Sequence, residues 1–304
     1  MTRHAAIILT FIARCRRTAL VLAGCCVVLG QALPSESVEV IVVGDTQLKP
    51  VIEIISGIRE TLGVPFEVYD AAQVRGKLRN IVAKEQALVI VALGKDAIDE
   101  TAHIPPSVAV IYDLVVKPPA LERPNTTGFY MATPVREYVE VVNRYLPALR
   151  WIAVVGSPDL MSVVEGPRNQ QVTSYRVTNP VELVSTVAQL DEVDAFLLLP
   201  DVSLLTASAV EDVYLQSFKK GIPILGVSER SVKQGALMAL VFDATRVGRQ
   251  IGEKALSAVR GEDMGRIPPS PSREFDLFLN LDTAKRMGID VPAELIRRAK
   301  RVYP

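Results

Sequence analysis

Short apolar runs rich in Val and Ile alternate with helix-like periods along most of the chain. The run VEVIVVG at residues 38–44 predicts a buried strand, and residues 48–63 have the apolar spacing of an amphipathic helix that stops at Gly63. Three more apolar runs, which begin at Pro65, Gln86 and Pro106, continue the strands. This alternation is typical of βαβ units around a parallel sheet.

The pattern then starts again. Residues 135–149 predict a helix and WIAVVGSP at 151–158 predicts a strand, after which four more strand-like runs alternate with amphipathic helices. VVGD at 42–45 corresponds to VVGS at 154–157, which suggests a duplicated lobe, although any two Rossmann-like sheets share such runs. We therefore expect an α/β protein with two Rossmann-like lobes, each built on a parallel sheet.

The first 32 residues have the order of a secretory signal peptide. An arginine-bearing start precedes the apolar run TALVLAGCCVVL and then small and turn residues, which predicts cleavage after Ala32. A second interpretation is a lipobox, LAGC, with Cys25 as a lipid anchor, and a third is a retained anchor. The apolar run is shorter than the roughly 20 residues that a bilayer span needs. All three interpretations place residues 36–304 in the periplasm or otherwise outside the cytoplasm.

Removing this leader changes the composition. The full chain of 304 residues has 34 basic and 34 acidic residues, and the leader holds four arginines and no acidic residue. The rest of the chain therefore has 34 − 4 = 30 basic and 34 acidic residues. A net charge of −4 argues against a nucleic-acid partner.

The leader also holds all three cysteines, and His103 is the one histidine outside it. Cys-His nucleophiles and multi-His zinc sites are thereby excluded, and neither G-x-S-x-G nor a glycine-rich phosphate loop occurs. We expect a protein that is not an enzyme and has no cofactor or metal.

Four motifs indicate a family. They are Gly-Ala-Leu at 235–237, Gly-Arg-Gln at 248–250, NLDTAKRMGIDVP at 280–292 and Asn-Thr-Thr-Gly at 125–128. The chain resembles, over most of residues 36–304, the ABC transporter substrate-binding proteins that include tryptophan-binding lipoproteins of the type I periplasmic-binding fold.

The resemblance implies a three-strand hinge between an N-terminal lobe, residues 33–130 plus 244–276, and a C-terminal lobe, residues 131–243 plus 277–304. It also implies a monomer that closes on a small molecule, an amino acid or related small carboxylate, and delivers it to a membrane permease. The alternative is a sensing or interaction module of the same fold, coupled to a membrane receptor rather than an importer.

Candidate ligand-binding residues follow the predicted strands, because the carboxyl ends of parallel strands meet at one edge of a sheet. Each has an ordinary structural alternative, such as a helix cap, core packing or a surface carboxylate. The first-lobe candidates are Asp45, Thr46, Gly94, Lys95, Tyr112, Asp113, Phe129 and Tyr130, and the second-lobe candidates are Ser157, Asp201, Glu229 and Phe242.

Two departures from the family leave the ligand open. Gly166-Pro167 predicts that the helix after WIAVVGSP ends after about two turns, so one wall of the site would be altered. Gly94-Lys95-Asp96 occupies a turn where relatives commonly have a small hydroxyl residue. Lys95 there would either neutralise an anionic ligand or point to solvent.

Overall fold

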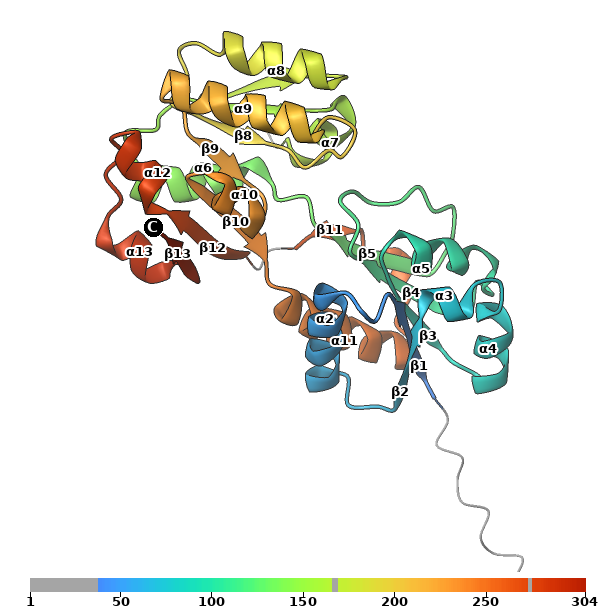
Figure 1. Ribbon diagram of the computed structural model, residues 1–304. Helices are drawn as coiled ribbons and strands as arrows, with labels where there is room; N and C mark the ends of the chain where they lie inside the picture. The colour runs from blue at the N-terminus through green and yellow to red at the C-terminus, as the bar shows by residue number, and fades with distance from the viewer. Residues whose placement is uncertain (1–37, 166–168, 273–274) are drawn as a thin grey trace, which may run out of the picture. The chain divides into compact units, whose positions relative to one another are not determined.

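The computed structural model describes residues 38–165, 169–272 and 275–304, so the expected signal peptide at 1–32, with Cys25, lies outside the described residues. The chain builds two sheets, and each forms the centre of an α/β lobe (Figure 1). This confirms the α/β class and the two parallel-sheet lobes expected from the sequence. Within the described residues, no helix combines the length and the apolar character that crossing a membrane requires.

The first sheet has the strand order β11-β5-β4-β3-β1-β2, and its neighbours are parallel. Its central strands are buried on both faces, which explains why they appear in the sequence as continuous Val and Ile runs. Its strands are β1 (Val40–Gly44), β2 (Phe66–Asp70), β3 (Val89–Leu93), β4 (Ala109–Asp113), β5 (Thr126–Tyr130) and β11 (Ser270–Pro271).

Helices cover both faces of the first sheet. Helices α2 and α11 pack on one face, and α3, α4 and α5 pack on the other. The bounds of these elements and of two short 3₁₀ turns are α2 (Lys49–Thr61), α3 (Ala71–Val74), α4 (Leu78–Glu85), α5 (Lys95–Glu100), η1 (Thr101–His103), α11 (Ala244–Val259) and η2 (Met264–Arg266).

Helices α2 and α11 lie side by side (Figure 1) and touch through glycines. A Cβ at Gly57 would lie 2.0 Å from the carbonyl oxygen of Thr245, and a Cβ at Gly248 would lie 2.2 Å from the carbonyl oxygen of Ile54. No larger residue fits at either position without moving a backbone. The Gly-Arg-Gln motif at 248–250 therefore marks a close helix contact.

The second sheet has the order β13-β12-β10-β9-β8-β6-β7. Its pairs are parallel except that β12 runs antiparallel to β10. Its strands are β6 (Ile152–Gly156), β7 (Val172–Arg176), β8 (Ala195–Leu198), β9 (Ile224–Gly226), β10 (Met238–Phe242), β12 (Phe275–Asn280) and β13 (Arg301–Tyr303).

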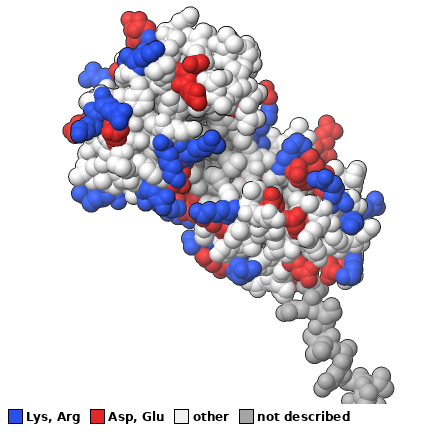
Figure 2. Space-filling view, viewed as in Figure 1, with Lys and Arg blue, Asp and Glu red and all other residues white. Residues whose placement is uncertain are grey.

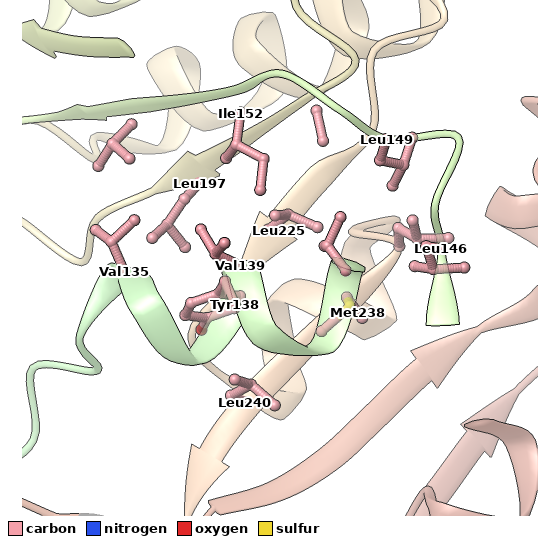
Figure 3. Close-up of a cluster of buried hydrophobic side chains, with 14 of the residues drawn as sticks. Val135, Tyr138, Val139, Leu146, Leu149, Ile152, Leu197, Leu225, Met238 and Leu240 are labelled. Atoms are coloured by element: carbon pink, nitrogen blue, oxygen red, sulfur yellow. The ribbon is translucent and has the colours of Figure 1, made fainter. Parts of the chain in front are cut away.

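Helices also cover both faces of the second sheet. Helices α6, α7, α12 and α13 bury side chains in one core, while α8 and α9 pack on the opposite face. Figure 3 shows Val135, Tyr138 and Val139 of α6 among residues from the strands. The bounds are α6 (Val135–Tyr145), α7 (Pro158–Val164), α8 (Pro180–Gln189), α9 (Ala207–Lys220), α10 (Glu229–Gln234), α12 (Leu281–Arg286) and α13 (Ala293–Arg298).

Two helices after the first lobe test the sequence patterns. Helix α6 ends at Tyr145, four residues before the predicted end, because Pro147 disfavours a helical conformation in the residue before it. Helix α7 has seven residues, which confirms the expected helix of about two turns. Within the described residues the chain passes between the sheets after β5, after β10 and after β11.

Candidate functional site

Three strands of the first sheet end level with one another. Gly44 of β1 is in register with Leu93 of β3, and Leu93 with Asp113 of β4. The residues that follow these strands therefore emerge side by side. The structure thus brings together the candidates at 45–46, 94–95 and 113 at one edge of the first sheet.

Most of these residues are held by nearby partners. The Thr46 amide and hydroxyl both donate to Oδ2 of Asp70 at 3.2 Å, and Asp45 accepts from the Gln47 amide. Neither caps helix α2, which has no side-chain cap. The ammonium group of Lys95, 79% exposed, lies 2.5 Å from the Asp99 carboxylate one turn along α5.

Asp113 differs from its neighbours because its side chain is buried. The residue is 2% exposed, and its Oδ2 has no hydrogen-bond partner among the described residues. Burial raises the pKa of this carboxyl from 3.8 to about 7, against a smaller opposing effect of the Leu114 amide. The backbone turns sharply here, since Leu114 has a φ of 59° and the Gly94 amide donates to the Asp113 carbonyl.

The three aromatic candidates of the first lobe mainly take part in packing. Tyr112 and Phe129 are 2% and 5% exposed and belong to cores on opposite faces of the sheet. A Cβ at Gly128 would lie 2.4 Å from the Tyr112 ring, so that ring is tightly fixed. Tyr130 is half-buried, and burial raises the pKa of its hydroxyl.

In the second lobe, Ser157 and Asp201 follow neighbouring strands β6 and β8. Burial alone would raise the pKa of Asp201, but the Ser157 and Ser203 hydroxyls and nearby amides outweigh it and lower that pKa. The Ser157 hydroxyl lies near the Asp201 carboxylate and lowers its pKa, although the distance and angle between them do not make a hydrogen bond. The Asp201 carboxyl is therefore ionised at neutral pH, beside Ser157.

Glu229 begins α10 and is held by three partners within the second lobe. Its carboxylate lies 2.8 Å from the Arg301 guanidinium and 3.2 Å from the Lys233 ammonium, and it accepts a hydrogen bond from the Tyr303 hydroxyl. The Tyr303 bond, followed by Lys233, lowers the pKa of Glu229 to about 2. These contacts fasten α10 to β13.

A groove of about 670 Å³ opens at the carboxyl ends of β8, β9 and β10, beside α9 and α10. Of the twelve candidate residues, Phe242 lines it. The Tyr214 hydroxyl of α9 donates to the Ser231 carbonyl of α10 at 2.9 Å, which joins the two helices across it. Its apolar lining includes Leu198, Pro200, Leu205, Tyr214, Val241 and Phe242.

Two charged residues line the same groove, Glu211 of α9 and Arg230 of α10. Sequence reasoning missed both, because each lies on the polar side of a short amphipathic pattern and looks like an ordinary surface charge. Their place after β8 and β9 was the available signal, since helices that follow strand ends face this edge of a sheet.

A larger cavity of about 740 Å³ lies on the α6 side of the second sheet. Two guanidinium groups, of Arg144 and Arg298, lie 5.1 and 5.5 Å from the centre of the Tyr145 ring. Arg144 also lies 3.5 Å from the Glu294 carboxylate. Because these lining charges already contact partners within the lobe, the cavity is a weaker candidate for a ligand site than the groove.

Charged side chains of both signs lie on the surface. Figure 2 shows acidic side chains beside basic ones over much of the face in view. In the described part of the chain, no three His, Cys, Asp or Glu side chains are placed to hold a metal ion.

The family motif at 280–292 has a structural explanation. The Asn280 side chain accepts from the Thr283 amide at 2.8 Å, which caps α12, and donates to the Val232 carbonyl at 2.9 Å. The Thr283 hydroxyl donates to the Gly235 carbonyl at 3.1 Å. These buried bonds join α12 to the end of α10, and so link two of the motifs that mark the family.

Solved structures share the fold. A ligand-free, open substrate-binding protein with adhesive properties from Clostridium difficile is 15% identical, with a TM-score of 0.65 over 87% of this chain and 98% of that one. An ABC domain in complex with L-Trp from Streptococcus pneumoniae is 20% identical, with a TM-score of 0.54 over 86% and 99%. A conserved domain protein from Vibrio cholerae is 19% identical, with a TM-score of 0.55 over 88% and 99%.

One curated relative also matches. It is a tyrosine-binding protein of Clostridioides difficile (strain R20291), 25% identical over 181 residues, and the match spans 56% of this chain and about half, 52%, of that protein. The profile of the ABC transporter substrate binding protein family matches residues 69–303, and this family consists of binding proteins rather than enzymes. The chain therefore belongs to the ABC transporter substrate-binding protein family.

Proposed function

We propose that this protein binds an aromatic amino acid and delivers it to the permease of an ABC importer. The observation that carries the ligand class is the groove at the strand ends of the second lobe, whose apolar wall includes Tyr214 and Phe242. A ring held against apolar and aromatic side chains buries large apolar area and stacks favourably. The tyrosine-binding relative and the L-Trp complex support the same class.

The rest of the transport cycle belongs to the same proposal. The leader exports the chain and is either cleaved or lipidated at Cys25. Residues 33–130 plus 244–276 then act as one lobe, and residues 131–243 plus 277–304 as the other. The lobes close on the ligand through the three crossings, as hinged binding proteins do.

The residues at the two strand-end edges complete the proposed site. Asp113, beside the turn at Gly94 and Lys95, is the first-lobe residue that we favour, because a buried and unpartnered carboxylate oxygen is costly unless something satisfies it. In the second lobe we favour Phe242 in the groove, with Ser157 and Asp201 at the neighbouring strand ends.

Calorimetry and thermal unfolding test the ligand class directly. L-tyrosine, L-tryptophan and L-phenylalanine are titrated into the protein, with L-leucine and L-aspartate as comparisons. A ligand present at about 100 times its Kd stabilises the folded protein by about 2.7 kcal/mol, which raises the Tm. If the aromatic amino acids bind no better than L-aspartate, the proposed ligand class is wrong.

A matched pair of variants then tests the groove. Phe242→Ala removes part of its apolar wall and should weaken aromatic amino-acid binding by about tenfold or more, since losing a buried aromatic contact costs above 1 kcal/mol. Val202→Ala changes a residue that is 94% exposed and should leave the affinity unchanged. Equal affinities for both variants would move the site away from the groove.

A further inference from the structure

Glu211 and Arg230 are the charged residues that line the second-lobe groove. Among residues 38–165, 169–272 and 275–304, neither the Glu211 carboxylate nor the Arg230 guanidinium has an ion-pair or hydrogen-bond partner. By contrast, Glu229 and Lys233 of α10 pair with each other. An anion and a cation without partners therefore border one apolar groove, while Glu229 and Lys233 nearby form an ion pair.

The helix geometry places both charges near one junction. Glu211 and Tyr214 are three residues apart on α9 and so lie on the same side of that helix. The Tyr214 hydroxyl is bonded to the carbonyl of Ser231, the residue after Arg230. Both charged side chains thus start from the point where α9 and α10 meet over the groove.

We propose that Glu211 and Arg230 recognise the backbone of a free amino acid, with Arg230 binding the α-carboxylate, Glu211 binding the α-ammonium and the apolar wall holding the side chain. This inference rests on the proposed function and adds the residues that distinguish an amino acid from related amines and acids. Opposite charges on one ligand carbon match opposite charges that do not pair with each other in the protein. Charge-assisted bonds of this kind are the stronger ones in proteins, and the planar guanidinium suits a carboxylate.

The amino end of α9 also favours a carboxylate in this groove. Ala207, at the start of the 14-residue helix α9, also lines the groove, and the amino end of a helix carries partial positive charge. A carboxylate that lies by this end of α9 gains from that partial charge. Glu211 lies one turn further along α9, where the partial positive charge of the helix end is weaker and repels a bound ammonium less.

Three ligands separate the two roles. L-tyrosine has both charged groups, tyramine lacks the carboxylate and hydroxyphenylpropionate lacks the ammonium. Arg230→Gln should weaken binding of L-tyrosine and hydroxyphenylpropionate by about tenfold or more and leave tyramine unchanged. Glu211→Gln should weaken L-tyrosine and tyramine by a similar factor and leave hydroxyphenylpropionate unchanged.

Exposed charges on the same helix supply the controls. Asp212→Asn changes the neighbour of Glu211, and Lys219→Gln changes a basic residue of the last turn; both are exposed and neither lines the groove. Both variants should bind all three ligands as the unmodified protein does. All four changes are at exposed positions, so circular dichroism should report the same fold in each.

The outcomes separate this inference from the proposed function. If the unmodified protein binds no aromatic amino acid, the proposed function is wrong and this inference falls with it. If it binds L-tyrosine, but Arg230→Gln and Glu211→Gln bind each ligand as tightly as their controls do, only the assignment of the two charges is overturned. A loss that is equal for all three ligands also overturns it, because it would indicate a change of groove shape.

Discussion

The buried carboxyl of Asp113 makes the stability of the folded protein depend on pH. Folding raises its pKa from 3.8 to about 7, so the folded state holds this proton more tightly than the unfolded chain does. The free energy of unfolding therefore falls as the pH rises from about 3.8 to about 7. Above that interval the stabilisation that the bound proton gives is absent. One pKa unit corresponds to about 1.36 kcal/mol, so a shift of roughly three units amounts to on the order of 4 kcal/mol.

Asp113→Asn replaces the ionisable group with a neutral one of the same shape. At a pH of about 4 the variant and the unmodified protein should unfold at similar urea concentrations, since Asp113 is then protonated in the folded state. At a pH of about 8 the variant should be more stable, by up to the order of 4 kcal/mol, because it no longer buries a charge without a partner.

Urea denaturation of both proteins across this pH range measures the difference directly, and effects of the other ionisable groups cancel in the comparison. Asp201→Asn is the control of opposite sign. Hydrogen bonds lower the pKa of Asp201, so its ionised form is stabilised in the folded state and the variant should lose stability at neutral pH. A difference between Asp113→Asn and the unmodified protein that does not change with pH would refute this reasoning.

Three further predictions concern helix packing, helix capping and the hydrogen bond between Tyr303 and Glu229. Gly248→Ala should lower the free energy of unfolding, measured in urea, by about 1–3 kcal/mol, because its Cβ would overpack the contact between α2 and α11. Glu253→Ala, at an exposed position of the same helix, should leave the free energy of unfolding unchanged. Equal stability of the two variants would contradict the close helix contact. Asn280→Ala removes the cap of α12 and the bond to Val232, so it should lower the free energy of unfolding by about 1–3 kcal/mol in the same assay. Ligand affinity should stay unchanged. A loss of binding without a loss of stability would instead place Asn280 in the ligand site. Tyr303→Phe should raise the pKa of Glu229 from about 2 toward its usual range in a carboxylate NMR titration, and an unchanged value would show that the ion pairs suffice.

The sequence predicted the architecture well because its strongest signals are local. β1 is buried at every position, so both faces of the strand need apolar residues and the run VIVVG follows directly. The end of α6 was misplaced because the apolar period continues past Tyr145, and Pro147 ends the helix within that pattern.

The site was harder to predict because it depends on contacts between distant segments. The sequence places Asp113 at a strand end, but its burial follows from neighbouring strands of the sheet. Glu211 and Arg230 belong to one groove because Tyr214 bonds to Ser231, a contact that the spacing within α9 and α10 does not indicate. Periodicity identifies which side of a helix is polar, but not which polar residues border a groove.

The glycine contact between α2 and α11 also affects the order in which the chain becomes stable during synthesis. Helix α2 is made early, but its buried side packs against a helix that begins at Ala244, after most strands of the second sheet have been made. Strand β5 likewise gains its outer neighbour at Ser270–Pro271. The first lobe therefore begins the chain but completes its core only after most of the second lobe has emerged from the ribosome.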